Sequence, residues 1–170
     1  MKYEDFIKDK QVLIKSSGIF VKRSDLNAKM FDFQKDIVRW ALAKGRSAIF
    51  ADCGLGKTLM QHEWAQKIVK NTKQSVLIVA PLSVSYQTQK EGEKFGYVVN
   101  VCASQNDVKH GINITNYEKL DKFVANKFGG VVLDESSILK SFSGKIRNQM
   151  ISMFCNVPFK LCCTATPAPN

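Results

Sequence analysis

The stretch AIFADCGLGKTLM, residues 48–60, places two glycines, a lysine and a threonine between two apolar segments. Consecutive backbone N–H groups in a glycine-rich turn, followed by the positive end of a helix, form a ready site for an anion. Lys57 would add charge at the outer phosphates of a nucleotide, and the Thr58 hydroxyl is placed to ligate magnesium. We assign nucleotide binding to Gly54, Leu55, Gly56, Lys57, Thr58 and Leu59.

The loop departs from the usual pattern at its first position. The pattern G-x-x-x-x-G-K-[ST] begins with glycine, and this chain has Ala51 there. An apolar strand is expected before the loop and a helix after it, so the context of the motif is kept. A fortuitous glycine turn is the alternative, and the context favours the phosphate-binding interpretation.

Two adjacent carboxylates, Asp134 and Glu135, follow the apolar segment VVL. A carboxylate at a strand end beside a phosphate loop can hold magnesium, and a second one can orient and deprotonate an attacking water. A strand that simply ends in polar residues is the alternative. With the phosphate loop upstream, we predict Thr58 and Asp134 as magnesium ligands, and Lys57, Asp134 and Glu135 as catalytic residues.

The segments that must position these residues alternate between helical and extended patterns from residue 31 onward. We predict helices over 31–45, 59–71, 83–95, 117–124 and 144–154, and strands over 47–51, 76–80, 97–102, 112–115, 129–135 and 159–166. Apolar strands separated by helices indicate a mostly parallel sheet with helices on both faces. Ligands of such sheets bind at the carboxyl ends of the strands, where both motifs fall.

At 170 residues with 45% hydrophobic residues, the chain is long enough for one sizeable core. We expect an N-terminal extension over 1–30 and one α/β domain over 31–170. Within the extension, VLIKSSGIFVKRSDL alternates apolar and polar residues around Gly18, which predicts a small β-hairpin. Trp40 and Trp64 lie at helical core spacing and are expected to pack inside.

The charge of the chain favours a polyanionic partner. Twenty-five Lys and Arg residues against 15 Asp and Glu give a net charge of +10, which suits nucleic acid. After Glu135 the chain contains four basic residues, Lys140, Lys145, Arg147 and Lys160, and no acidic one. A merely solvated basic surface is the alternative for any one of these side chains.

The five cysteines form no C-x-x-C pair and have no matching histidine spacing. We therefore expect neither structural zinc nor a disulfide framework, and interpret the cysteines as buried, reduced thiols. The amino-terminal residues are charged, and no segment reaches the ~18 apolar residues of a membrane span. No membrane partner and a cytoplasmic location, in a bacterial or phage-infected cell, are expected.

Five stretches, in order, resemble motifs of the first motor domain of superfamily 2 helicases, closest to Swi/Snf-type ATPases and their phage-encoded relatives. They are FDFQ for the adenine-reading motif, APLSVSYQTQKE for motif Ia, ITNYE for motif Ib, LDESS for motif II and TATPAPN for motif III. The resemblance covers residues 31–170. It implies a RecA-like P-loop NTPase fold, ATP and Mg²⁺ as cofactors, and Gln34 as a contact to the adenine edge.

The same resemblance implies contacts with a nucleic-acid backbone. The candidates are Ser83, Ser85, Thr115 and Asn116. Helix capping explains these residue types equally well. Phosphate contacts position a protein without reading sequence, so we expect little base specificity, with duplex DNA favoured as the track. For Tyr117, core packing is favoured over stacking on a base.

The chain departs from the family pattern at two places. Ser136 and Ser137 stand where many relatives have alanine or glycine and then histidine, so the histidine that communicates with motif III is missing. The chain also stops after motif III, where relatives continue into a second motor domain that supplies an arginine finger. Such a finger contributes roughly 10³ to 10⁵ in rate, so we expect slow hydrolysis by this chain alone.

The leading hypothesis is the ATP-binding motor domain of a nucleic-acid-dependent ATPase, completed by a second RecA-like domain. A small-molecule P-loop kinase is one alternative. The other is a nucleotide-gated binding module that never turns over.

Overall fold

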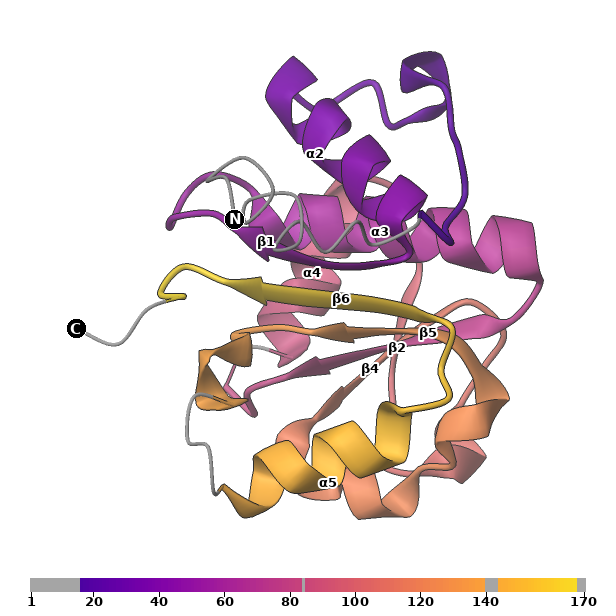
Figure 1. The fold of residues 1–170 in the computed structure, drawn as a ribbon, viewed down its shortest axis with the longest axis vertical. Helices are drawn as coiled ribbons and strands as arrows, with labels where there is room; N and C mark the ends of the chain where they lie inside the picture. Colours follow the sequence, from indigo (N-terminus) through magenta and orange to yellow (C-terminus); the bar gives the residue numbers. More distant parts are fainter. Residues whose placement is uncertain (1–15, 84, 140–143, 168–170) are drawn as a thin grey trace, which may run out of the picture.

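The computed structural model describes residues 16–83, 85–139 and 144–167. Their strands form one six-stranded sheet in the order β1-β6-β5-β2-β4-β3, and every neighbouring pair is parallel (Figure 1). The strands are β1 Arg46–Phe50, β2 Ser75–Ala80, β3 Val99–Val101, β4 Ile112–Asn116, β5 Phe128–Leu133 and β6 Phe159–Thr164. All six predicted strands and the parallel sheet are confirmed.

Helices cover both faces of the sheet. They are α2 Asp32–Lys44, α3 Lys57–Thr72, α4 Ser85–Lys94 and α5 Lys145–Phe154. Figure 1 shows α2 and α3 on one face and α5 on the other. The helix expected over 117–124 forms as the 3-10 helix η3, Tyr117–Lys122. The helices therefore lie close to their predicted places.

Strand β2 shows how one segment serves two cores. Val76, Ile78 and Ala80 pack with the side chains of α2 and α3. Leu77 and Val79 pack with those of η3 and α5. All five are 0% exposed, because successive side chains of a strand point to opposite faces. A strand buried on both faces reads as the continuous apolar run seen in the sequence.

The predicted hairpin is not formed in the part of it that the structure describes. Residues 12–15 of the hairpin lie outside the described residues, and Ser16–Leu26 contain no strand. The Gly18 and Ile19 N–H groups instead donate to the carbonyls of Ala43 and Leu42 at the end of α2, at 3.1 and 2.9 Å. A Cβ on Gly18 would lie 1.8 Å from the Leu42 oxygen, so the glycine permits this close approach.

Two predictions of burial are wrong. Trp64 is 0% exposed, as expected, but Trp40 is 49% exposed. Trp40 borders a groove between α2 and β1. Strand β1 lies at an edge of the described sheet, so no further strand covers this groove. Among the cysteines, Cys53 and Cys155 are exposed, whereas Cys102 and Cys163 are buried. In the described part of the chain, no helix has the length and apolar character needed to span a bilayer.

Candidate nucleotide-binding site

The glycine-rich loop connects the end of β1 to the start of α3. Gly54 and Gly56 have φ angles of +80° and +78°, a left-handed conformation that favours glycine. A Cβ on Gly56 would lie 2.3 Å from the Gln34 Nε2 atom. Ala51, which replaces the usual first glycine, is not among the residues with positive φ and packs in the core. The departure at Ala51 therefore causes no backbone strain.

Gln34 connects the start of α2 to this loop. Its Nε2 donates to the Leu55 carbonyl at 3.0 Å, and its Oε1 accepts from the Phe31 N–H at 2.9 Å. The side chain is only 4% exposed. Gln34 thus holds the loop in place in this structure, and its contact with a base stays a prediction.

Lys57 is the first residue of α3 and turns back onto the loop. Its Nζ donates to the carbonyls of Ala51 and Asp52, at 2.8 and 3.2 Å. The ammonium therefore lies inside the concave side of the loop, where positive charge and the amino end of α3 add together. Thr58 follows in the first turn of the same helix.

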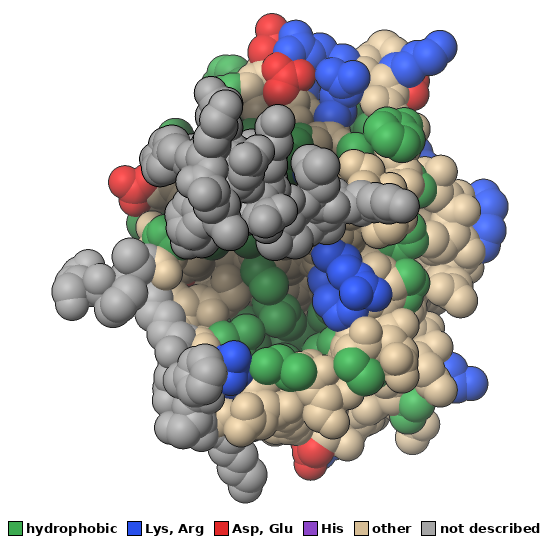
Figure 2. Space-filling view, in the orientation of Figure 1, with side chains coloured by type: hydrophobic (Ala, Val, Ile, Leu, Met, Phe, Trp, Pro, Cys, Tyr) green, Lys and Arg blue, Asp and Glu red, His purple; other side chains and the backbone are tan. Residues whose placement is uncertain are grey.

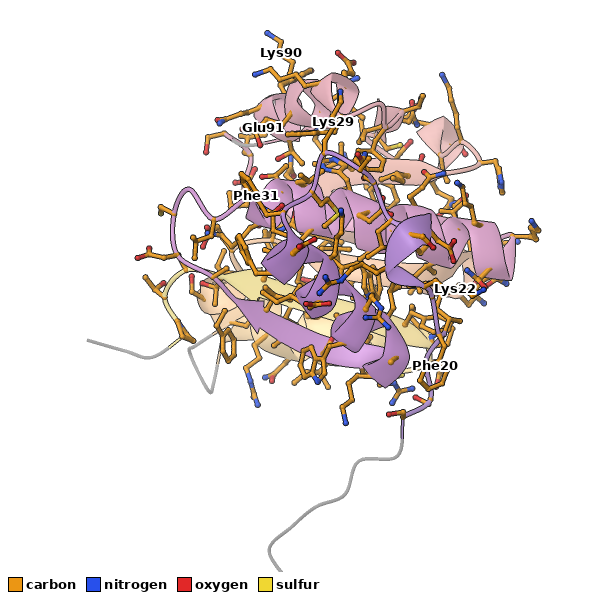
Figure 3. The ribbon with its side chains drawn as sticks, turned by 90° about the horizontal axis from the view of Figure 1, so that it is seen from above. Phe20, Lys22, Lys29, Phe31, Lys90 and Glu91 are labelled. Atoms are coloured by element: carbon orange, nitrogen blue, oxygen red, sulfur yellow. The ribbon has the colours of Figure 1, made fainter. Side chains whose placement is uncertain are left out.

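A cavity of about 560 Å³ opens beside the loop. Gln34, Gly54, Gly56, Lys57, Thr58 and Leu59 line it, together with Lys29, Phe31, Glu91 and Phe95. Figure 3 shows Lys29, Phe31 and Glu91 near one another on one side of the domain. Phe31 is 69% exposed, and its ring stacks on that of Phe33 at 6.1 Å between centroids. An exposed aromatic ring at the rim of the cavity suits a planar base.

Sequence reasoning missed Lys29, Glu91 and Phe95 as cavity residues. Lys29 precedes α2, Glu91 lies on α4 and Phe95 follows it. None carries a local motif, because the packing of α4 beside α3 brings Glu91 and Phe95 to the loop, and Lys29 comes from the segment before α2. The Lys29 ammonium donates to the Lys94 carbonyl at 2.9 Å.

Asp134 follows β5 and is 7% exposed. Its N–H donates to the Val79 carbonyl at 2.8 Å, and its Oδ1 accepts from the Gln61 Nε2 at 2.6 Å. Burial raises the pKa of the Asp134 carboxyl, and the Gln61 hydrogen bond acts in the opposite direction. The positive charge of Lys57 also lowers this pKa.

Gln61 was not predicted as a site residue. It is 0% exposed and lies one helical turn after Lys57, on the same side of α3. The four-residue spacing from Lys57 could have indicated that Gln61 faces the site, but a buried glutamine on a helix has no characteristic motif. Its amide fixes the orientation of the Asp134 carboxylate.

Hydrogen bonds join the segment around the carboxylate pair to the end of the neighbouring strand β6 and to Tyr117, which follows β4. Thr164 Oγ1 donates to Glu135 Oε2 at 3.4 Å, and Ser136 Oγ donates to the Cys163 carbonyl at 3.1 Å. The Tyr117 hydroxyl donates to the Asp134 carbonyl at 2.7 Å. Ser136 and Thr164 therefore provide contact between motifs II and III in a chain that lacks the family's histidine.

Glu135 itself has a φ angle of +48°, which is uncommon for a residue with a side chain. A backbone in this region costs on the order of 1–3 kcal/mol, and such residues cluster at functional sites. The hydrogen bonds of Asp134 and Ser136, on either side, hold this conformation.

The four predicted nucleic-acid residues have different surroundings. Ser83 is exposed in the loop after β2, and Ser85 begins α4. Thr115 and Asn116, at the end of β4, are 1% and 4% exposed. Thr115 Oγ1 and Asn116 Oδ1 have no hydrogen-bond partner among the described residues. Nucleic-acid contact by these four residues stays a prediction, and side-chain contact by Thr115 or Asn116 requires the end of β4 to open.

These groups fit a magnesium nucleotide. The loop offers N–H groups and the Lys57 ammonium to phosphates, and Thr58 and Asp134 offer the oxygen atoms that magnesium prefers. In the part of the chain that is described, no group of three or more His, Cys, Asp or Glu side chains is placed to hold a metal. The oxygen donors would thus act together with phosphate and water oxygens, as is usual for Mg²⁺.

A parallel sheet with this loop, and with a carboxylate pair after another strand, defines a P-loop NTPase domain of the RecA-like type. Residues 27–169 match the family described as "Type III restriction enzyme, res subunit", and the chain belongs to this family. Its fold and motifs are those of the first motor domain of a superfamily 2 helicase. It is a helicase- or SNF2-like ATPase motor domain.

Two relatives give the scale of the similarity. The SWI/SNF-related matrix-associated actin-dependent regulator of chromatin subfamily A-like protein 1 of Xenopus tropicalis is 31% identical over 129 residues, which are 69% of this chain and 14% of that protein. The DNA annealing helicase and endonuclease ZRANB3 of Bos taurus is 28% identical over 169 residues, which are 84% of this chain and 15% of that protein. The chain thus spans about one seventh of these relatives.

Solved structures show the same fold. The SWI2/SNF2 ATPase core of Sulfolobus solfataricus, in complex with dsDNA, has a TM-score of 0.72 at 21% identity, covering 88% of this chain and 34% of that one. The UvsW helicase of bacteriophage T4 has a TM-score of 0.69 at 18% identity, covering 98% of this chain and 61% of that one.

Proposed function

We propose that the chain binds Mg-ATP and is the first motor domain of a DNA-dependent ATPase, in which a second RecA-like domain completes the hydrolytic site. One observation carries the proposal: Lys57 and the Asp134–Glu135 pair lie at the same edge of the sheet, and Thr164 binds Glu135. The dsDNA complex of the similar SWI2/SNF2 core supports duplex DNA as the track.

Each residue has one part in the proposed reaction. The loop N–H groups and the Lys57 ammonium bind the phosphates, and Thr58 and Asp134 hold Mg²⁺. Bound Mg²⁺ would neutralise charge that develops on the phosphate oxygens. Gln34 contacts the adenine edge, and Phe31 packs on the base.

Glu135 acts as the general base. Its carboxylate orients the attacking water and accepts a proton at one oxygen, while Thr164 holds Oε2 from the side of β6. Ser83, Ser85, Thr115 and Asn116 are the proposed positions of nucleic-acid contact on this domain. A cytoplasmic location in a bacterial or phage-infected cell stays a prediction.

The test is the substitution Glu135→Gln in the protein completed by its second RecA-like domain, measured as ATP hydrolysis with and without duplex DNA. Loss of a general base lowers the rate by about 10²- to 10⁴-fold, while binding of ATP is retained because Glu135 is not among the phosphate-binding residues. Ser137→Ala is the control, since it alters a neighbouring hydroxyl and should leave the rate within a few-fold.

Two other outcomes would contradict the proposal. Transfer of phosphate from ATP to a small hydroxylated acceptor, with no response to DNA, would indicate a kinase. Unchanged properties of the Glu135→Gln variant would indicate a nucleotide-gated module that does not turn over.

A further inference from the structure

The two edges of the sheet carry opposite charge. We define the amino-end edge of the sheet by the first two residues of each strand and the three residues that precede that strand. This edge holds six Lys or Arg residues and no Asp or Glu: Lys44, Arg46, Lys73, Lys109, Lys127 and Lys160. The carboxyl-end edge, counted in the same way over the last two residues and the three that follow, holds Asp52, Glu118, Asp134 and Glu135, and Lys119 is the one Lys or Arg within this window. Lys57, at the start of α3, adds a second cation on this side of the sheet.

The amino-end edge is also hollowed. A cavity of about 440 Å³ lies there, and its polar lining includes Lys70, Lys73, Lys109 and His110. None of its eleven lining residues is acidic. The four cationic or titratable side chains are exposed, so their charges project into water. In Figure 1 the arrowheads of β1 and β6 point to the left, and Figure 2, in the same orientation, shows Lys and Arg side chains along the opposite, right-hand side.

Local structure explains only part of this charge. Lys70 and Lys73 lie at the end of α3, where the helix dipole favours cations. Arg46 and Lys160 donate to backbone carbonyls of Pro158 and Val157. Lys109 lies in the loop before β4, two residues after the short 3-10 helix η2, Gln105–Asp107.

No ion pair of the described residues involves Lys73 or Lys109. Their charge is therefore available to a partner.

We propose that the amino-end edge, centred on Lys70, Lys73 and Lys109, binds the phosphate backbone of a second duplex DNA segment. The proposal rests on the proposed function only in taking DNA as the polyanion. Strands of about six residues at ~3.3 Å each separate the two edges by roughly 20 Å, and the edges face opposite ways. One segment can therefore lie at the carboxyl-end edge, beside Ser83, while another lies at the amino-end edge. Lysine ammonium groups bind phosphates as point charges, so this contact reads no sequence.

The test compares two double variants with the same change in net charge. Lys73→Glu with Lys109→Glu alters the amino-end edge, and Lys22→Glu with Lys122→Glu alters exposed lysines outside both edges. Binding of a labelled 12-base-pair duplex is followed by fluorescence anisotropy across a salt series, and the number of duplexes bound at saturation is measured at low salt.

The edge variant should bind one duplex where the unaltered chain binds two. Each lost phosphate contact makes the negative slope of log K against log salt shallower by about 0.9, so the slope for binding at this edge should become shallower by about 1.8. The control variant should keep two duplexes and the full slope. Lys73→Arg with Lys109→Arg keeps the charge and should bind as the unaltered chain does.

Three results would overturn the inference. Equal slopes for the edge and control variants would show that net charge alone attracts DNA. A single duplex bound by the unaltered chain, or an arginine variant as weak as the glutamate variant, would rule out a second phosphate contact made by these charges.

A chain that binds no duplex at low salt, yet is stabilised by Mg-ATP, would remove the DNA part of the proposed function as well. Binding of one duplex with full salt sensitivity in both variants would remove the second site alone. The two failures are therefore distinguishable.

Discussion

The carboxyl-end and amino-end edges of one sheet differ in how their charged groups are held. At the carboxyl-end edge, Asp134 is buried, its carboxylate accepts a hydrogen bond from Gln61, and its backbone carbonyl accepts one from the Tyr117 hydroxyl. At the amino-end edge, Lys73 and Lys109 are exposed and project into water. The first edge is a preorganised site, and the second is a charged surface.

The difference predicts two kinds of response to mutation and to salt. Buried, hydrogen-bonded groups are weakly screened and depend on geometry, so small changes in shape at the carboxyl-end edge should have large effects. Exposed charges are screened by salt and tolerate changes in shape.

Gly56→Ala should cause the largest loss. The new Cβ would lie 2.3 Å from Gln34 Nε2, at a φ angle of +78°. Gly96→Ala, at the amino-end edge, shares the positive φ of +84° but meets nothing within 4 Å. Gly56→Ala should displace the Gln34 amide and add the strain of a left-handed φ within the phosphate loop itself, and it should therefore lose most of the stabilisation by Mg-ATP in a thermal shift assay. Gly96→Ala should keep the stabilisation by Mg-ATP. Its free energy of unfolding should fall only by the ~1 kcal/mol that a left-handed backbone costs an alanine.

Gly56→Ala and Gly96→Ala could instead lose equal amounts of the thermal stabilisation by Mg-ATP. That result would contradict the interpretation that nucleotide binding depends on how Gln34 fits against the loop.

Asp134→Asn should stabilise the nucleotide-free domain while removing the proposed magnesium ligand. Burial raises the pKa of Asp134, so the folded state holds its proton more tightly than the unfolded state does. The stability contributed by this group is present at low pH and falls as pH rises through the folded pKa. At pH 7 the variant should melt at a higher temperature than the unaltered chain.

The advantage of Asp134→Asn should shrink as pH falls toward 4, because the native carboxyl then becomes protonated as well. A variant that melts lower than the unaltered chain at pH 7 would contradict the interpretation that burial dominates at Asp134.

Gln34→Ala should have the smallest effect of the carboxyl-end changes. It removes two hydrogen bonds, each worth about 0.5–1.5 kcal/mol, and weakens nucleotide binding about 10-fold. If Gln34 also contacts adenine, the loss should be greater for ATP than for GTP in competition assays. Equal loss for both nucleotides would leave Gln34 with only the role of holding the Leu55 carbonyl.

Most of the fold could be predicted because each element has a local signal. The runs VLIVA and GGVVL are apolar because β2 and β5 are buried on both faces. Gly45, with a φ angle of +76°, ends α2 where the sequence places its end. The phosphate loop was equally local, since its glycines, lysine and threonine are consecutive.

What could not be predicted depends on contacts between distant segments. Trp40 has helical core spacing, but only the position of β1 at a sheet edge leaves it half exposed. The alternation around Gly18 resembles a hairpin, yet its N–H groups bind the end of α2. Gln61 joins the site through the packing of α3 against β5, and Lys29 through its hydrogen bond to the Lys94 carbonyl at the end of α4. No short motif encodes either contact.

The assignment of the nucleotide site to the carboxyl-end edge is tested by replacing one lysine from each edge. Lys57→Ala and Lys73→Ala are heated with and without saturating Mg-ATP, and the shift in Tm is recorded. At a nucleotide concentration about 100 times Kd, the unaltered chain should gain about 2.7 kcal/mol. Lys73→Ala should keep that shift and Lys57→Ala should lose it. A full shift in Lys57→Ala, or a lost shift in Lys73→Ala, would contradict the assignment of the carboxyl-end edge as the nucleotide site.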